Sequence, residues 1–453
     1  MKYTPVIGLE VHVELKTKSK MFCRCSADYF GKKPNTHTCP VCLGLPGALP
    51  VPNKKAIEWC IMLGYALNCE IPPFSRFDRK NYFYPDLPKG YQISQYDQPF
   101  AVDGEVFIKQ EPNSQNKEKK IDVRRVHMEE DTGKLIHEGD LTLIDFNRSG
   151  VPLVEIVTEP DFVNPFEVTE YLKSLKQIVR YLGISNADME KGEMRLEPNI
   201  SLRKEGEKRP SYKVEVKNIN SFKFVERAIE FELARQREIL DKGETPVQET
   251  RGFIEKTQST VSQRIKEEAS DYRYFPEPDI PPFRWTDEQR NNWKTEVKNL
   301  LEEARKNSPK EKANFYVGLG VSNASGASIS ASKYRTQVFE AVIKENILPK
   351  EQLGKFGNFL ANKPEEKIDQ NLVPNLTKQL INQFKSSTTT ADIDDKELDK
   401  AIELVLRENE TAVSDYKRGK ENAIMFLVGQ VMHNFPQKID ASKVKASLLA
   451  KIK

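Results

Sequence analysis

The 453-residue sequence lacks both a long apolar segment and a strong excess of charge of one sign. No apolar run reaches the roughly 18 residues that a membrane-spanning helix needs. The first ten residues carry a glutamate and no small-residue cleavage site, so we expect them to form a strand rather than a signal peptide. We therefore expect a cytoplasmic protein without membrane contact. A formal net charge of only +3 excludes a global basic field for nucleic acid.

The short motifs of the common nucleotide-binding and acyl-transfer enzymes are also missing. The sequence contains no Walker loop, no kinase glycine-rich loop and no G-x-S-x-G nucleophile elbow. The usual scaffolds for these two chemistries are therefore unsupported.

The composition is that of a globular protein, since 38% of the residues are hydrophobic and 30% are charged. At this length we expect two or three domains. In the first part, Asp103-Gly104 between apolar residues predicts a tight hairpin. Longer helices are predicted over residues 165–182 and 221–240. Strand runs without regular alternation with helices favour an α+β domain with a largely antiparallel sheet.

A cluster of prolines between residues 275 and 282 marks the first domain boundary, because proline continues neither a helix nor a central strand. The following Thr286-Asp-Glu-Gln289 predicts a capping box that opens a helix. Beyond it we expect helices, interrupted at residues 318–332 and 386–390. The predicted domains are an α+β domain, a helical domain and a small helical tail, at residues 1–285, 286–391 and 392–453.

Four of the six cysteines form the most specific local motif. Cys23 and Cys25 are followed, after thirteen residues, by Cys39 and Cys42. This paired spacing suits tetrahedral thiolate coordination of Zn²⁺. Four sulfur ligands leave no open position, so the zinc would be structural. Free or buried thiols are the alternative, and disulfides are disfavoured in a cytosolic chain. The other two cysteines lie in or just after an apolar helical stretch and are predicted to be core residues.

The last part of the sequence is basic although the whole chain is nearly neutral. Residues 411–453 contain eight lysines and arginines and three acidic residues, a local net charge of +5. Lys417, Arg418 and Lys420 cluster where a helix is predicted to begin. A basic end on a near-neutral body indicates a module that contacts a polyanion. A solvated helical face is the alternative interpretation.

Acidic and basic side chains share the faces of several predicted strands, because alternate residues of a strand point to the same side. In the first strand this face carries Glu10, His12 and Glu14. In two later strands the corresponding face carries the basic residues Arg195, Arg203 and Lys217, with acidic residues between them. Glu155 stands alone among apolar neighbours, where a solvated charge is unexpected.

This inventory suits one type of chemistry. One imidazole and several carboxylates suit Mg²⁺, a hard ion that prefers oxygen ligands. Arginine and lysine beside them suit the phosphate oxygens of a nucleotide, so the set indicates metal-assisted phosphoryl transfer. The adjacent Glu129 and Glu130 are both candidates, and alternation alone does not choose between them. The alternative interpretation is that these charged residues form the solvent-exposed face of an antiparallel sheet and bind nothing.

Several blocks of sequence together resemble one family, the B subunits of the three-subunit Asp/Glu-tRNA amidotransferases. The blocks are Val6–Leu15, Asp78–Asp86, Tyr91–Gln95, His127–Asp131, Asp145–Ile156, Lys217–Phe222, Asp271–Asp279 and Ser414–Met432. The likeness is dense over residues 1–285 and resumes near the end of the chain. Many blocks in the same order are far more specific than any single motif.

The resemblance implies a cradle-shaped α+β domain related to the fold of glutamine synthetase and the guanido kinases, followed by a helical domain and a YqeY-like, tRNA-binding tail. It implies that the cradle uses ATP and Mg²⁺ to phosphorylate the side-chain carboxylate of misacylated Glu-tRNA(Gln) and/or Asp-tRNA(Asn). Ammonia released from glutamine by the amidase, the A component of the complex, would then displace phosphate. A small C component would tie the amidase to this chain.

Site residues are implied by matched position. The Mg²⁺ ligands would be His12, Glu130 and Glu155, with Glu10 beside them. Two further residues fall near the ammonia route, Lys80 and Lys89. No nucleophilic residue of the chain is required, because the substrate carboxylate attacks ATP and ammonia attacks the acyl phosphate.

Two features of the sequence bear on the resemblance, one against it and one for it. Residues 318–332 differ from the usual helical-domain sequence of the family. Only a few residues separate Pro282 from the next predicted helix. The archaeal paralogues carry a large insertion at that point, so the short spacing favours this family over them.

Two other classes of function remain: a zinc-stabilised, non-catalytic tRNA-binding protein, and a free-standing carboxylate kinase or ligase for a small substrate. The first leaves the histidine and carboxylates idle, and the second has no use for the basic tail.

Overall fold

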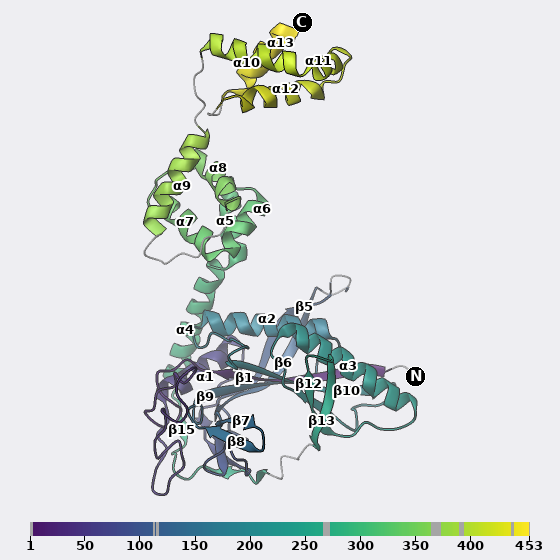
Figure 1. Cartoon of the computed structure of the whole chain (residues 1–453). Coiled ribbons are helices and arrows are strands. Elements are labelled where there is room, and N and C mark those ends of the chain that lie inside the picture. The colour runs from purple at the N-terminus through teal and green to yellow at the C-terminus, as the bar shows by residue number, and fades with distance from the viewer. Residues whose placement is uncertain are drawn as a thin grey trace. The chain divides into compact units, whose positions relative to one another are not determined.

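The structure is a computed structural model (Figure 1), and it describes residues 3–111, 114, 117–265, 272–363, 373–388, 394–435 and 439–452. The chain divides into two compact units, Met1–Ala304 and Arg305–Lys453. Among the described residues, no helix is both long and apolar enough to cross a membrane.

An eight-stranded sheet dominates the first unit, with the strand order β13-β12-β11-β10-β1-β9-β6-β5. Its strands are β1 (Tyr3–Glu14), β5 (Ala101–Lys109), β6 (Glu118–Glu130), β9 (Pro152–Thr158), β10 (Met194–Lys204), β11 (Val214–Lys217), β12 (Glu249–Ile254) and β13 (Ser259–Ile265). Within this sheet β11 and β12 pair in parallel and the other neighbours pair antiparallel. The expectation of mixed helices and strands with a largely antiparallel sheet is confirmed.

Among the residues that the structure describes, three smaller sheets accompany the large one. The first has the order β14-β3-β4, formed by β14 (Phe275–Pro276), β3 (Asp78–Asn81) and β4 (Tyr91–Ser94). The other two are pairs, β15 (Phe283–Arg284) with β2 (Phe74–Ser75) and β7 (Lys134–Glu138) with β8 (Leu141–Asp145). Residues 275–284 therefore return to pair with strands about two hundred positions earlier in the chain.

The predicted helices of the first unit form, each for a local reason. The helices are α1 (Lys54–Ala66), α2 (Pro165–Tyr181), α3 (Phe222–Asp241) and α4 (Asp287–Lys306). Asn164 and Ser221 cap α2 and α3 by accepting backbone N–H groups with their side chains. The capping box of α4 is confirmed: Thr286 N donates to Gln289 Oε1 at 2.9 Å, and Gln289 N donates to Thr286 Oγ1 at 3.2 Å.

The large sheet has one apolar and one polar face. Along β1 the apolar residues from Ile7 to Val13 are buried, in one core with side chains from α1, α2 and α3. Figure 1 shows α2 and α3 on one side of this sheet. Because side chains alternate along a strand, Glu10, His12 and Glu14 of β1 point to the opposite face. The charged residues are thus collected on the face without those helices.

The predicted hairpin at Asp103-Gly104 is wrong. Both residues lie inside β5, which pairs with β6 on either side of them. Asp103 has a positive φ of 51°. A Cβ at Gly104 would clash with Cys69 Sγ and lie 2.7 Å from the Leu67 carbonyl oxygen. The glycine is therefore required by a close approach of the chain that follows α1, not by a turn.

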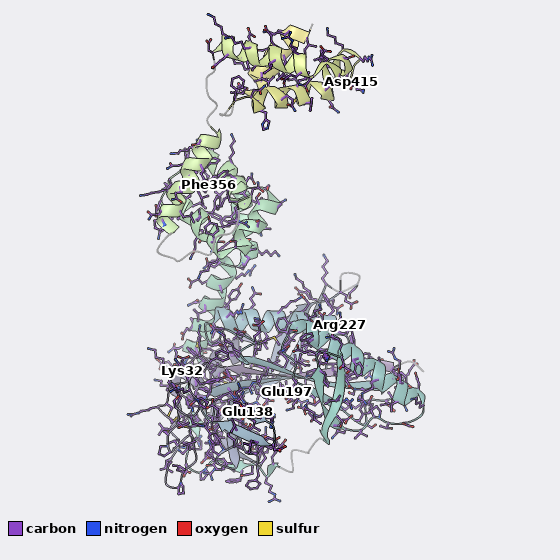
Figure 2. All side chains as sticks on the ribbon, in the orientation of Figure 1. Lys32, Glu138, Glu197, Arg227, Phe356 and Asp415 are labelled. Atoms are coloured by element: carbon purple, nitrogen blue, oxygen red, sulfur yellow. The ribbon has the colours of Figure 1, made fainter. Side chains whose placement is uncertain are left out.

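The described part of the second unit is helical and contains two apolar cores. Its helices are α5 (Pro309–Gly318), α6 (Asn323–Ala331), α7 (Lys333–Lys344), α8 (Lys350–Ala361), α9 (Val373–Thr388), α10 (Asp395–Glu408), α11 (Glu410–Lys417), α12 (Asn422–His433) and α13 (Ala441–Ile452). Phe356, labelled in Figure 2, is fully buried in the core of α5 to α9. The second core is formed by α10 to α13. The expected interruption at residues 318–332 is partly wrong, because Asn323–Ala331 is helical.

Candidate active site and cysteine cluster

Three neighbouring strands of the large sheet place one functional side chain each in a row on its polar face. His12 of β1 is the register partner of Glu155 on β9, and Glu155 is the partner of His127 on β6. The Nε2 atoms of His12 and His127 lie 3.8 and 2.9 Å from Glu155 Oε2. Directly opposed residues on antiparallel strands keep their side chains in contact range, so the sheet register itself assembles this row.

Glu129 completes the row, because it lies two residues after His127 on the same face of β6. His127 Nε2 is 3.5 Å from Glu129 Oε1. Two hydrogen bonds to this carboxylate come from β4, where Ser94 Oγ donates to Oε1 at 2.7 Å and Gln92 Nε2 donates to Oε2 at 3.1 Å. Ligand atoms of His12, Glu129 and Glu155 all lie within 4.8 Å of one another. Two carboxylates and one imidazole at this spacing fit a small divalent cation.

The electrostatics of the row keep its carboxylates ionised. Burial raises the pKa of the Glu155 carboxyl, but the imidazoles of His127 and His12 outweigh this effect and lower the pKa to about 2. Burial also raises the pKa of Glu129, yet Lys80 and His127 hold it well below its ordinary value. The Nδ1 atoms of His12 and His127 are buried without a hydrogen-bond partner in the protein. Both carboxylates of the row are therefore ionised, and its two imidazoles have unused nitrogen atoms.

The structure does not group Glu130 with His12 and Glu155. As the next residue along β6, Glu130 points away from Glu129, and its carboxylate lies 2.5 and 2.6 Å from Lys89 Nζ. Its Oε1 also accepts the backbone N–H of Ile93 at 2.9 Å. Glu130 and Lys89 border a cavity of about 150 Å³ that they share with the cysteine loop. Of the adjacent pair, Glu129 is the one placed at the candidate metal site.

Lys80 lies at the edge of the row. Its Nζ is 3.9 Å from Glu129 Oε1. Burial lowers the pKa of Lys80, but Glu129, together with Tyr274 and Glu155, holds it well above its ordinary value. The ammonium therefore remains charged beside the carboxylates.

A second acidic group lies farther along the sheet, where Glu10, Glu197 and Glu215 place carboxylate oxygens within 4.8 Å of one another. Glu197 is labelled in Figure 2. Lys217 joins this group, with its Nζ 3.0 Å from Glu197 and 3.6 Å from Glu215. Asn199 Nδ2 donates to Glu10 at 2.9 Å. This cluster lies next to His12, because Glu10 precedes it by two residues on the same face.

The other two predicted phosphate-binding cations are placed differently. Arg195 is the register partner of His12. Its guanidinium forms ion pairs with Asp131 and Glu14, the latter at 3.3 Å. Arg203 lies near the other end of β10, opposite Thr4. The structure thus brings Arg195 and Lys217 near the row but does not bring Arg203 there.

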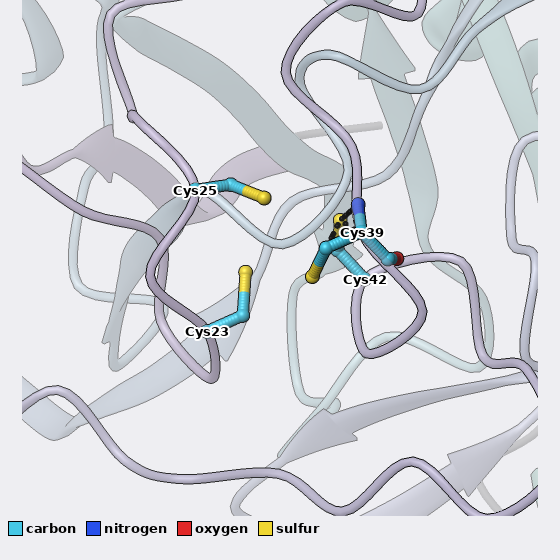
Figure 3. A group of neighbouring side chains, drawn as sticks. All are labelled: Cys23, Cys25, Cys39 and Cys42. Atoms are coloured by element: carbon cyan, nitrogen blue, oxygen red, sulfur yellow. Dashed lines mark hydrogen bonds between the residues drawn. The ribbon is translucent and has the colours of Figure 1, made fainter.

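The four predicted zinc ligands come together (Figure 3). The sulfur atoms of Cys23, Cys25, Cys39 and Cys42 all lie within 4.8 Å of one another. The Cys39 backbone N–H donates to Cys42 Sγ at 3.2 Å, and the buried Lys20 Nζ lies 3.7 Å from the same sulfur. A hydrogen bond with Cys23 lowers the pKa of the Cys42 thiol to about 5, and Lys20 acts in the same direction. This arrangement fits a metal that takes thiolate ligands. Cys60 and Cys69 are buried core residues, as predicted.

The basic cluster of the tail lies between α11 and α12. Lys417 ends α11, and Gly419 continues the chain with a φ of +92°. Lys420 Nζ pairs with Asp415 at 3.0 Å in an exposed position. Beyond it Ile424, Leu427, Val428 and Val431 of α12 are buried, as their spacing predicts.

Sequence reasoning assigned no role to His127 of the row, or to Gln92 and Ser94 of β4, which contact the row. All three lie in blocks that carry the family resemblance, at residues 127–131 and 91–95. Alternation along β6 places His127 on the face of Glu129, so a local signal for it exists. The approach of β4 to β6 has no such signal, because it depends on long-range packing.

Comparison with known proteins gives matches over nearly the whole chain. The profile of the GatB/GatE catalytic domain matches residues 5–291, and that of the GatB domain matches residues 299–452. Three similar relatives are each named as the B subunit of an aspartyl/glutamyl-tRNA(Asn/Gln) amidotransferase. The protein of Thermosipho melanesiensis is 43% identical, covering 98% of both chains. That of Persephonella marina is 44% identical over 95% of this chain and 96% of its own. That of Caldanaerobacter subterraneus is 43% identical over 95% of each.

Proposed function

The chain belongs to the GatB family of aspartyl/glutamyl-tRNA(Asn/Gln) amidotransferase B subunits, and on this premise we propose that it uses ATP to activate the substrate before amidation. The substrate is the side-chain carboxylate of Glu-tRNA(Gln), of Asp-tRNA(Asn), or of both. The observation that carries the proposal is the row of His12, Glu155 and Glu129 with Lys80 beside it.

The proposed reaction has two balanced steps. A carboxylate oxygen of the substrate attacks the γ-phosphorus of ATP, an acyl phosphate forms and ADP leaves. The nitrogen of ammonia then attacks the acyl carbon, inorganic phosphate leaves and the nitrogen loses a proton. The first step is needed because a carboxylate would otherwise have to expel oxide, whereas phosphate is a good leaving group.

The proposed Mg²⁺ ligands are His12, Glu155 and one of the two adjacent glutamates. The resemblance points to Glu130, but the geometry supports Glu129, since Glu130 is engaged by Lys89. Mg²⁺ in this position would offset the negative charge of the ATP phosphates near the carboxylate.

The cations of the site fit the same reaction. Lys80 keeps a positive charge beside the carboxylates of the row, where it favours the approach of anionic groups. Lys89 holds the carboxylate of Glu130 next to the cavity beside the cysteine loop, and with Lys80 it is proposed to border the ammonia route. Arg195, Arg203 and Lys217 remain the proposed contacts for the nucleotide. Lys217 is supported by its place beside Glu10, and Arg203 has no such support.

The cysteine cluster is proposed to hold a structural Zn²⁺. Four sulfur ligands close a tetrahedral site, so no position is left for a substrate. The support is their convergence from two separate turns of the segment between β1 and α1. Bound metal would fix this loop beside the cavity bordered by Lys89 and Glu130.

The remaining assignments follow from the family. We propose that the first domain, residues 1–285, is the cradle related to glutamine synthetase and the guanido kinases. The helical domain and the YqeY-like tail, residues 286–391 and 392–453, would carry the contacts with tRNA. The partners are the amidase, which releases ammonia, and the small third component of the complex. Because the substrate is a charged tRNA, the proposed compartment is the cytoplasm.

Reconstitution tests this function. The chain is assembled with the amidase and the small component and given ATP, Mg²⁺, an ammonium salt and either Glu-tRNA(Gln) or Asp-tRNA(Asn). We expect formation of amidated tRNA, with one ADP released for each amide formed. A complex that binds tRNA but releases no ADP would instead support the zinc-stabilised tRNA-binding protein. Amidation of free glutamate without tRNA would support the small-substrate ligase.

A further inference from the structure

The block at residues 271–279 has no role in the proposed reaction, although it is one of the blocks that carry the family likeness. Asp271 lies outside the described residues, and the structure describes the block from Tyr272 onward. Phe275 and Pro276 form β14, which pairs with β3 so that Phe275 lies opposite Arg79. The block therefore lies beside the strand that carries Lys80.

Polar contacts fasten this segment to β3. Arg79 donates to Glu277 through Nε at 2.7 Å and through Nη2 at 2.9 Å, a bidentate pair. Arg79 Nη2 also donates to Asp279 at 3.0 Å. On the other side of the block, Asn81 Nδ2 donates to the Arg273 carbonyl oxygen at 2.8 Å. These contacts hold the backbone on both sides of Tyr274.

The fastened segment places aromatic rings around the ammonium of Lys80. The centroid of the Tyr272 ring lies 5.1 Å from Lys80 Nζ, and that of Tyr82 lies 5.9 Å from it. These two rings meet edge to face at 5.9 Å. Tyr274 stacks on Tyr96 of the same sheet region at 4.4 Å. Two tyrosine faces within about 6 Å of a cation attract it through their quadrupoles.

Strand register directs the same ammonium toward Glu129. Lys80 on β3 is the partner of Gln92 on β4, and Gln92 donates to Glu129. Lys80 and Gln92 therefore lie on the same side of the small sheet. The ammonium lies between the carboxylate of Glu129, 3.9 Å away, and the rings of Tyr272 and Tyr82.

We propose that Tyr272 is a positioning residue that holds the Lys80 ammonium toward Glu129. A lysine side chain has four rotatable carbon–carbon bonds. A half-buried lysine that loses the aromatic ring beside its ammonium therefore extends toward water. The ring of Tyr272 supplies attraction without a competing charge. Its hydroxyl is not needed for this role, so phenylalanine serves equally well and leucine does not.

The placement is tested without reference to activity. The lysines are reductively methylated with ¹³C-formaldehyde, which preserves their charge, and the resonance absent from Lys80→Arg is assigned to Lys80. We expect this resonance to be shifted upfield by the ring currents of Tyr272 and Tyr82. It should move toward the position of exposed lysines in Tyr272→Leu and stay in place in Tyr272→Phe. An unchanged resonance in Tyr272→Leu overturns the proposal.

The consequence for catalysis rests on the proposed function and is measured in the complex with the amidase and the small component, with ammonium as the nitrogen donor. Tyr272→Leu should lower the rate of amidation by about 2- to 30-fold, and Tyr272→Phe should retain it. In a Lys80→Met background Tyr272→Leu should cause no further loss. Phe30→Leu is the matched control, because Phe30 is exposed and lies 5.8 Å from the ammonium of Lys191.

The outcomes separate the two claims. Failure of the unsubstituted complex to amidate contradicts the proposed function, while the resonance of Lys80 still decides the placement. An equal loss from Tyr272→Leu with and without Lys80 shows a merely structural role and overturns the proposal. If Tyr272→Leu is too unstable for its activity to be measured, the proposal is tested with Tyr272→Phe alone. A loss of activity in Tyr272→Phe contradicts a role carried by the ring.

Discussion

His12 and Glu155 lie directly opposite each other on antiparallel strands β1 and β9, and their side chains approach to 3.8 Å across 142 intervening residues. Neither residue could reach the other by local folding. The pairing depends on the order of the strands, in which β1 lies between β10 and β9. The site is therefore a product of the topology of the sheet, and it should respond to changes in either residue.

The first prediction concerns Glu155. Substitution by glutamine keeps the shape of the side chain and removes its negative charge. Because this carboxylate is buried and ionised at the centre of the row, we expect Glu155→Gln to lower ATP-dependent amidation at least about 100-fold. Binding of tRNA should stay close to normal. Glu159→Gln is the control, since Glu159 is partly exposed and pairs with Arg124. Normal amidation by Glu155→Gln would exclude the assignment.

The second prediction separates Glu129 from Glu130. Only Glu129 has an oxygen within 4.8 Å of the ligand atoms of His12 and Glu155 among the described groups, whereas Glu130 is paired with Lys89. We expect Glu129→Gln to weaken Mn²⁺ binding at least about tenfold and to do so more strongly than Glu130→Gln. Electron paramagnetic resonance of Mn²⁺, used in place of Mg²⁺, measures both. The reverse order would restore the ligand set implied by the resemblance.

The third prediction concerns the cysteines. Protein purified under reducing conditions should contain one zinc per chain, and Cys42→Ser should lose it because the substitution removes one of four sulfur ligands. Loss of the metal should lower the free energy of unfolding by about 2 kcal/mol or more. Cys60→Ser is the contrast, because Cys60 lies in the apolar core; it should destabilise the protein and leave the zinc content unchanged. Metal analysis that finds no zinc in the unsubstituted protein contradicts the assignment.

Local signals in the sequence predicted local structure well. Alternation identified the polar face of β1, apolar spacing predicted α2, and a capping box located the start of α4. Cysteine spacing predicted a cluster that the structure brings together, because all four residues lie within one loop segment. These features depend on contacts between residues that are close in the chain.

What the sequence could not show depends on contacts between distant residues. The choice between Glu129 and Glu130 depends on which of the two side chains lies on the face of the sheet that carries Glu155, and alternation within β6 contains no such information. The error at Asp103-Gly104 has the same origin. That dipeptide is a local hairpin signal, yet the glycine is required by Cys69 and the chain around it. Tyr272, one of the two tyrosines beside Lys80, comes from a segment about 190 residues away, which no local pattern connects to β3.

The last prediction concerns the tail. The buried residues of its core lie between Leu398 and Ile452, so removal of residues 394–453 leaves the core of α5 to α9 unchanged. We expect the truncated chain, assembled with its two partners, to show a several-fold higher KM for charged tRNA. Phosphate contacts position a nucleic acid without reading its bases, so the rate at saturating tRNA should change little.

A charge-only variant tests the same assignment without removing the domain. Replacement of Lys417, Arg418 and Lys420 by glutamine removes three cations beside the exposed turn at Gly419. Each lost phosphate contact should reduce the slope of log affinity against log salt by about 0.7 to 0.9, so a loss of about 2 to 3 is expected if all three engage. The control removes the same charge from α13 at Lys443, Lys445 and Lys451, two of which pair with acidic residues of α10. An unchanged affinity and salt slope in the first variant would reassign the basic turn to contact with another protein, because a cation that binds phosphate must release counterions when it does so.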